Sequence, residues 1–138
     1  MNETQLWKEY SEGLHIEWSF SISTEDMRLF SDLSGDGNPL HLDSQFAQTK
    51  GFASPVVYGV LLCAQMSRLI GEEMPDKHSI IMEIQMDFLS PCLPEDALIF
   101  SADLISKSDS THTYQCKCKI IKDNKVMCKG TVGAIWKP

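Results

Sequence analysis

The sequence predicts an α+β protein in which an antiparallel sheet packs against a buried helix. Three observations lead to this prediction: an alternating segment near residue 15, helical patterns from residue 23 to residue 70, and several alternating segments after residue 80. Strands and helices that are segregated along a chain are typical of this class. The length of 138 residues fits one domain, which we expect to span residues 1–138.

The first elements follow from alternation and from capping residues. Residues 1–13 are polar with scattered aromatic side chains, and we expect an irregular segment there. Apolar and polar residues alternate over residues 15–21, which predicts a strand. Ser23 or Thr24 is suited to cap a short helix, and Gly35 is suited to end it.

Two further helices are predicted in the middle of the chain. Asp43 is expected to cap a short helix that extends to Lys50. The most apolar segment, Val56–Ile70, has few polar interruptions, and a helix that is apolar on most sides is a buried one. Gly71, with Pro75 beyond it, is expected to end this helix.

The remainder of the chain predicts four strands. Apolar and polar residues alternate over Met82–Phe88, so we expect a half-buried strand whose apolar face packs on the central helix. Three longer strands are predicted at residues 97–107, 111–122 and 125–136. Asp123-Asn124 is expected to form the hairpin turn between the last two.

The strongest functional signal is the run Ser-Gly-Asp-Gly-Asn-Pro-Leu-His at positions 34–41. It places a carboxylate, Asp36, five positions before an imidazole, His41, and the residues between them favour a tight turn. An acid and a base on one loop can hold a water molecule, as is needed to add water to a carbon–carbon double bond or to remove it. Asn38 is expected to be structural and to orient Asp36 or His41.

This run resembles the signature of the MaoC-like (R)-specific enoyl-CoA hydratases, Ser-Gly-Asp-x-Asn-Pro-Leu-His. A second block, Pro-Val-Val-Tyr-Gly-Val-Leu at positions 55–61, is similar to the family's Pro-Ile-Val-His-Gly-Met-Leu, and the similarity extends from about Trp18 to the end of the sequence. The resemblance implies the hot-dog fold, in which a curved antiparallel sheet wraps around a long central helix. It also assigns Asp36 and His41 jointly to the catalytic water.

When each residue is considered singly, an Asx turn at Asp36 and a structural role for His41 are the simpler interpretations. The length of the match favours catalysis.

Two neighbouring residues are expected to complete the site. Gly59 lies at the start of the buried helix, where unpaired N–H groups favour negative charge, and the resemblance points to the same glycine as the oxyanion residue. A glycine needed only for packing against the sheet is the alternative. Tyr58 stands where the family usually has histidine, and we expect this larger side chain to shape the acyl pocket or to donate to the substrate.

The predicted function is (R)-specific hydration or dehydration of 2-enoyl or 3-hydroxyacyl thioesters carried by coenzyme A or an acyl carrier protein, with no metal and no other cofactor. His41 is expected to take the proton from water, while Asp36 holds the water and protonates carbon 2. The alternatives are a hot-dog thioesterase and a non-catalytic thioester-binding or assembly subunit. The resemblance also implies a homodimer or an oligomer built from dimers.

Composition limits the partners further. The net charge of −7 argues against a nucleic acid, and no apolar run is long enough to span a membrane. Five cysteines, with no secretory signal recognised, favour reduced thiols and a cytoplasmic location. The net negative charge does not favour binding of the phosphates of coenzyme A. The candidate cations for these phosphates are Lys50, Arg68 and Lys77. Cys116 and Cys118 are expected to fill space on one face of a strand.

Overall fold

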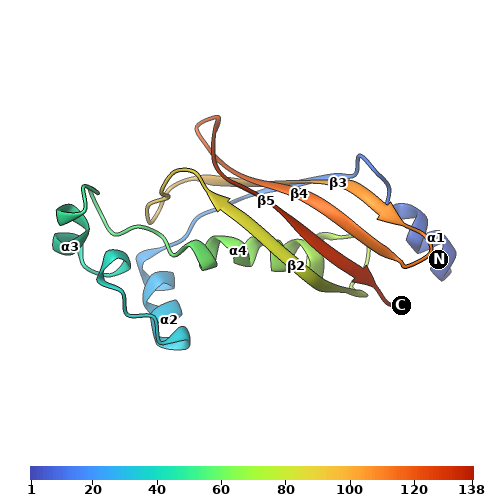
Figure 1. Ribbon diagram of the computed structural model, residues 1–138, viewed down its shortest axis with the longest axis horizontal. Coiled ribbons are helices and arrows are strands. Elements are labelled where there is room, and N and C mark those ends of the chain that lie inside the picture. The colour runs from blue at the N-terminus through green and yellow to red at the C-terminus, as the bar shows by residue number, and fades with distance from the viewer.

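A five-stranded antiparallel sheet, with strand order β1-β3-β4-β5-β2, forms the body of the computed structural model, which describes all 138 residues. The strands β1 to β5 are His15–Phe20, Ser79–Phe88, Leu98–Ser108, Thr113–Lys122 and Lys125–Trp136. Helix α4 (Gly59–Arg68) lies lengthwise over one face of this sheet (Figure 1). This is the hot-dog fold, and it confirms the predicted α+β class. None of the helices has the length and apolar character needed to cross a membrane.

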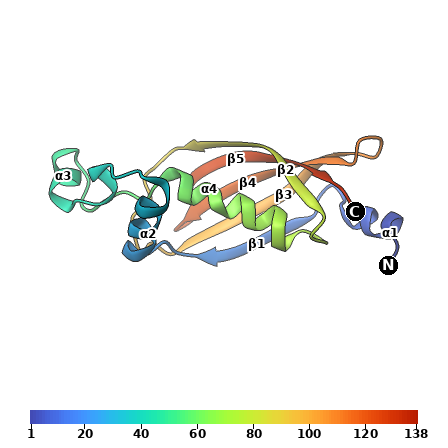
Figure 2. The ribbon, with the colours of Figure 1, turned by 90° about the horizontal axis from the view of Figure 1, so that it is seen from below.

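The shorter helices lie at the two ends of the sheet. Helices α2 (Thr24–Ser34) and α3 (Ser44–Thr49) lie beyond one end, and α1 (Glu3–Glu9) lies at the other (Figure 2). The predicted caps are confirmed. Ser23 accepts a hydrogen bond from the Asp26 N–H at the start of α2, and Gly35 ends this helix with φ of 78°. Asp43 caps α3 by accepting hydrogen bonds from two N–H groups of its first turn.

The central helix begins three residues later than predicted. The N–H groups of Val56 and Val57 donate to the carbonyl oxygens of Leu40 and Cys92, which holds this segment outside the helix. The helix also continues past the predicted end at Gly71, as a π-helical turn over Leu69–Glu73. Both boundaries were wrong because hydrogen bonds, and not residue preferences, decide them.

The prediction of an irregular segment at residues 1–13 was wrong, because Glu3–Glu9 forms α1. Asn2 and Gln5 form a reciprocal capping box: each side chain accepts a hydrogen bond from the other residue's N–H, at 2.9 Å in both cases. This pairing stabilises the first turn of a helix that is otherwise too short to be stable alone.

Aromatic side chains from distant parts of the chain join α1 to the end of the sheet. Trp7 stacks on Trp136 with ring centroids 5.4 Å apart, and Tyr10 contacts Tyr114 at 5.0 Å. The carboxylate of Asp76 accepts hydrogen bonds from the Tyr10 hydroxyl at 2.9 Å and from the Trp136 indole N–H at 2.8 Å. We call these four rings and Asp76 the aromatic cluster.

Strand β2 is an edge strand, and its apolar face is more exposed than predicted. Met86 packs against the core and Phe88 lies against the start of α4, as expected. Met82 is 66% exposed and Ile84 is 42% exposed, because no further strand or helix covers this edge. Phe88 is itself 53% exposed, so among the apolar side chains of Met82–Phe88 only Met86 packs against the core, and the expectation of a half-buried strand does not hold for the strand as a whole.

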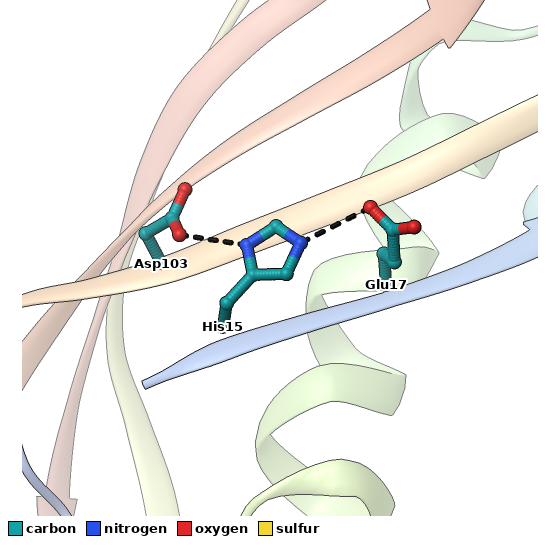
Figure 3. Close-up of polar contacts among 3 residues, drawn as sticks. All are labelled: His15, Glu17 and Asp103. Carbon is teal, nitrogen blue, oxygen red and sulfur yellow. Dashed lines mark hydrogen bonds and ion pairs between the residues drawn. The ribbon is translucent and has the colours of Figure 1, made fainter. Parts of the chain in front are cut away.

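The other face of the sheet carries polar side chains and no helix. There His15 lies between two carboxylates, with Nδ1 2.7 Å from Asp103 Oδ1 and Nε2 3.0 Å from Glu17 Oε2 (Figure 3). On the helix-facing side, Cys116 and Cys118 are buried within the core, as the spacing predicted.

Candidate active site

The loop between α2 and α3 is built from a chain of short-range hydrogen bonds. The Asp36 N–H donates to Ser34 Oγ at 3.1 Å, and Asp36 Oδ1 accepts from the Asn38 N–H at 3.1 Å. Asn38 Oδ1 in turn accepts from the Leu40 N–H at 3.0 Å, and a short 3-10 turn, Pro39–His41, follows. Each side chain thus fixes the backbone two residues further on. The Asn38 side chain thus holds the loop backbone at Leu40 and forms no hydrogen bond with the side chain of Asp36 or His41.

The imidazole of His41 is held in one tautomer. Its Nδ1 lies 2.6 Å from the carbonyl oxygen of Val56, and a carbonyl oxygen only accepts, so Nδ1 carries the proton. In the neutral ring Nε2 therefore keeps its lone pair and is available as a base. Asp36, on the same loop, is exposed and forms no hydrogen bond with the His41 side chain.

Tyr58 lies behind this loop and is buried. Its hydroxyl donates to the backbone carbonyl oxygen of Asp36 at 2.6 Å, and its ring stacks on the His41 imidazole with centroids 4.1 Å apart. Phe30 packs against the same ring at 4.7 Å. The structure thus places Tyr58 against both ends of the loop, and not in the walls of either cavity that reaches His41.

Gly59 is the first residue of α4, and its N–H donates to no other group of the protein. It lines an apolar cavity of about 310 Å³ together with His41, Phe88 and Cys92. A Cβ at residue 59 would lie 2.8 Å from Cζ of Phe88, closer than real contacts allow. The geometry therefore agrees with both expectations for Gly59: a free N–H at a helix N-terminus, and close packing that only glycine permits.

Sequence reasoning missed two contributors to this cavity. Val56 acts through its backbone carbonyl, for which no side-chain signal exists. Phe88 comes from the end of β2, 29 positions after Gly59, and only the pairing of the elements brings it there. A second cavity of about 560 Å³ lies on the other side of His41, between α2 and the segment that precedes β3.

The three candidate cations do not gather in one place. Arg68 pairs with Glu73 at 2.8 Å, and Lys77 pairs with Glu72 at 3.2 Å. Lys50 follows α3, at the opposite end of the molecule from the C-terminal end of α4 (Figure 1). The structure therefore does not form a phosphate site from these residues.

The fold is a hot-dog domain in which a loop with Asp36 and His41 lies beside the N-terminus of the central helix. A family model described as "MaoC like domain" matches residues 8–125. The chain belongs to the MaoC-like family.

The curated relatives and the solved structure described next are named as hydratases or dehydratases. Over 84 residues the chain is 41% identical to an (R)-specific enoyl-CoA hydratase of Aeromonas caviae, a match that covers 61% of this chain and 63% of that protein. Over 96 residues it is 27% identical to a mitochondrial 3-hydroxyacyl-[acyl-carrier-protein] dehydratase of Arabidopsis thaliana, which covers 70% of this chain and 57% of that one. The solved structure of an (R)-hydratase from A. caviae superimposes with a TM-score of 0.86 and 26% identity, over 92% of this chain and 97% of the other. The matched segments thus span about six-tenths of the two curated relatives.

Proposed function

We propose that this chain catalyses the (R)-specific hydration of 2-enoyl thioesters and the reverse dehydration of 3-hydroxyacyl thioesters. The observation that supports the proposal most directly is His41, whose Nδ1–H is fixed on the Val56 carbonyl so that Nε2 is free as a base beside an apolar cavity. The names of the relatives, a hydratase and a dehydratase, support the same reaction. Coenzyme A or an acyl carrier protein is the proposed carrier of the acyl group.

In the proposed mechanism, one water molecule adds across the double bond. His41 Nε2 takes a proton from water as the water oxygen bonds to carbon 3, and Asp36 orients the water and delivers a proton to carbon 2. Negative charge that develops on the thioester oxygen is stabilised by the free N–H of Gly59 at the N-terminus of α4. His41 then releases its proton to solvent and Asp36 regains one from solvent, so the net change is the addition of one water molecule.

The test follows the loss of enoyl absorbance with 2-enoyl-CoA substrates of increasing chain length, with the (R) and (S) products resolved. Asp36→Asn and His41→Ala should each lower turnover by about 10²–10⁴-fold, the usual contribution of a positioned acid or base. The two losses should not add, because both residues act on one water. Asp32→Asn and His78→Ala are matched controls, since neither side chain takes part in the loop. Near-full activity of either single variant would refute the mechanism.

We also propose that two copies of the chain associate through the β2 edge and that the substrate binds near their interface. Ile80, Met82 and Ile84 on this edge are exposed, as is the Asp36 loop, and a sheet edge of this kind is normally covered. Ile84→Lys should produce a monomer in sedimentation velocity at micromolar concentration. Ile99→Lys is the control, because Ile99 is equally exposed but lies on the interior strand β3. A monomeric, fully active wild-type protein would contradict the proposal.

The five cysteines are all free, as expected in a reducing compartment, and a cytoplasmic location is part of the proposal.

A further inference from the structure

We infer that Tyr58 is a positioning residue that joins the two ends of the acid–base loop, an inference that rests on the proposed roles of Asp36 and His41. The Tyr58 side chain is 2% exposed. Its hydroxyl donates to the Asp36 carbonyl oxygen at 2.6 Å, and its ring lies on the His41 imidazole at 4.1 Å with an angle of 27° between the planes. One side chain therefore contacts the residue at each end of the loop.

The hydroxyl fixes the Asp36 end. The Asp36 carbonyl oxygen accepts no backbone hydrogen bond, so the Tyr58 phenol is its partner within the protein. The Asp36 carboxylate is held only by the Asn38 N–H, within an exposed loop. Loss of the phenol would leave this carbonyl to water and would detach the Asp36 end of the loop from the core.

The ring fixes the His41 end. The hydrogen bond from Nδ1 to Val56 sets one point of the imidazole but permits rotation about the N–H···O axis. The nearly parallel Tyr58 ring closes off one face of the imidazole and limits that rotation. The two contacts together set the direction in which Nε2, the proposed base, points.

A role in lining the acyl pocket does not account for these contacts. Neither cavity that reaches His41 has Tyr58 in its wall. Simple filling of space would need only the ring, which phenylalanine also supplies, whereas the Tyr58 hydroxyl has a specific acceptor. Removal of the hydroxyl alone therefore distinguishes positioning from filling.

The experiment compares three variants in steady-state kinetics with a 2-enoyl-CoA, and in ¹⁵N NMR of the His41 imidazole. Tyr58→Phe should lower kcat about tenfold with little change in KM, less than the roughly hundredfold cost of a 1 Å misplacement. Tyr58→Leu, which also removes the ring, should lower kcat further and should shift and broaden the His41 ¹⁵N signals, because the imidazole can then rotate about its hydrogen bond to Val56. Tyr10→Phe is the matched control, since it removes another buried hydroxyl, 2.9 Å from Asp76 in the aromatic cluster. It should lower thermal stability and leave kcat unchanged.

Unchanged kcat in Tyr58→Phe together with unchanged ¹⁵N shifts in Tyr58→Leu would overturn the inference. A loss of kcat in Tyr10→Phe as large as that in Tyr58→Phe would overturn it too, because the effect would then be one of general stability. If Tyr58→Phe does not fold, 4-fluorophenylalanine at position 58 makes the same comparison, because its ring can still cover His41 and its fluorine fills the place of the hydroxyl without a proton to donate. Full activity of Asp36→Asn or His41→Ala would instead refute the proposed function, and the ¹⁵N comparison would still report on the loop.

Discussion

The contact between Gly59 and Phe88 can be tested by adding a single methyl group. In Gly59→Ala the new Cβ would lie 2.8 Å from Cζ and 2.9 Å from Cε1 of Phe88, so the ring must retreat until these distances reach at least 3.4 Å. Phe88 is 53% exposed and can move. We therefore expect a strain of about 1 kcal/mol, the lower end of the range for overpacked cores. The better helix propensity of alanine offsets up to about 1 kcal/mol of it.

The stability of Gly59→Ala should thus stay within about 1 kcal/mol of wild type, while activity falls. The displaced ring forms part of the cavity wall beside His41, and changes of this size in a pocket alter kcat/KM by about 10–200-fold. The assay is kcat/KM over several enoyl chain lengths, with thermal unfolding in parallel. Phe88→Leu in the same chain should restore most of the lost activity, because alanine retains the backbone N–H that faces the proposed oxyanion.

Two results would refute this reasoning. If the double variant stays as inactive as Gly59→Ala, the loss of activity comes from the methyl group itself, which obstructs the substrate, and the displaced Phe88 ring is not its cause. If Gly59→Ala has the stability and chain-length profile of wild type, the contact with Phe88 does not constrain residue 59.

Three further predictions concern the rest of the molecule. Hydrogen bonds, first to Asp103 and then to Glu17, raise the pKa of His15 in the folded protein. The protonated His15 therefore stabilises the fold fully below the pKa of the unfolded state, about 6.5, and this contribution is lost as pH rises through the pKa of the folded state. In urea titrations His15→Gln should lower the free energy of unfolding by about 0.2–1 kcal/mol near pH 5.5 and by almost nothing near pH 9. An equal loss at the two pH values would contradict this prediction. Burial raises the pKa of the Cys116 and Cys118 thiols to about 12, so neither should react with an aromatic disulfide reagent near pH 8 until urea unfolds the protein. Trp7→Ala should lower the free energy of unfolding by about 3–5 kcal/mol in thermal or urea unfolding and leave kcat unchanged, since the aromatic cluster lies at the end of the sheet away from the loop; a selective loss of kcat would contradict that separation.

Features set by neighbours in sequence were predicted well. The limits of α2 follow from Ser23 and Gly35, and the turn before β5 follows from Asp123 and Asn124, which both adopt positive φ. The turn-forming residues from Asp36 to His41 also form the expected loop. In each case the hydrogen bonds or backbone angles involve residues only a few positions apart, so the local sequence contains the necessary information.

Features that depend on distant partners could not be predicted. The start of α4 is decided by hydrogen bonds from Val56 and Val57 to segments that the chain brings together only on folding. The exposure of β2 follows from its place at the edge of the sheet, which alternation does not reveal. Tyr58 was expected near the substrate, and its hydrogen bond to the carbonyl of Asp36, 22 positions away, has no signature in residue type.

The pairing of the sheet sets the order in which a ribosome can complete this protein. Strand β1 has a single partner, β3, and its His15 lies opposite Asp103, 88 positions later. At about 5–20 residues per second, β1 waits roughly 4–18 s in the emerging chain before that partner is made. Helix α1 waits longer still, because Trp7 packs on Trp136. The apolar residues Ile16, Trp18 and Phe20 therefore lack their β3 neighbours over this interval, and this N-terminal strand is open to aggregation while the rest of the sheet is made.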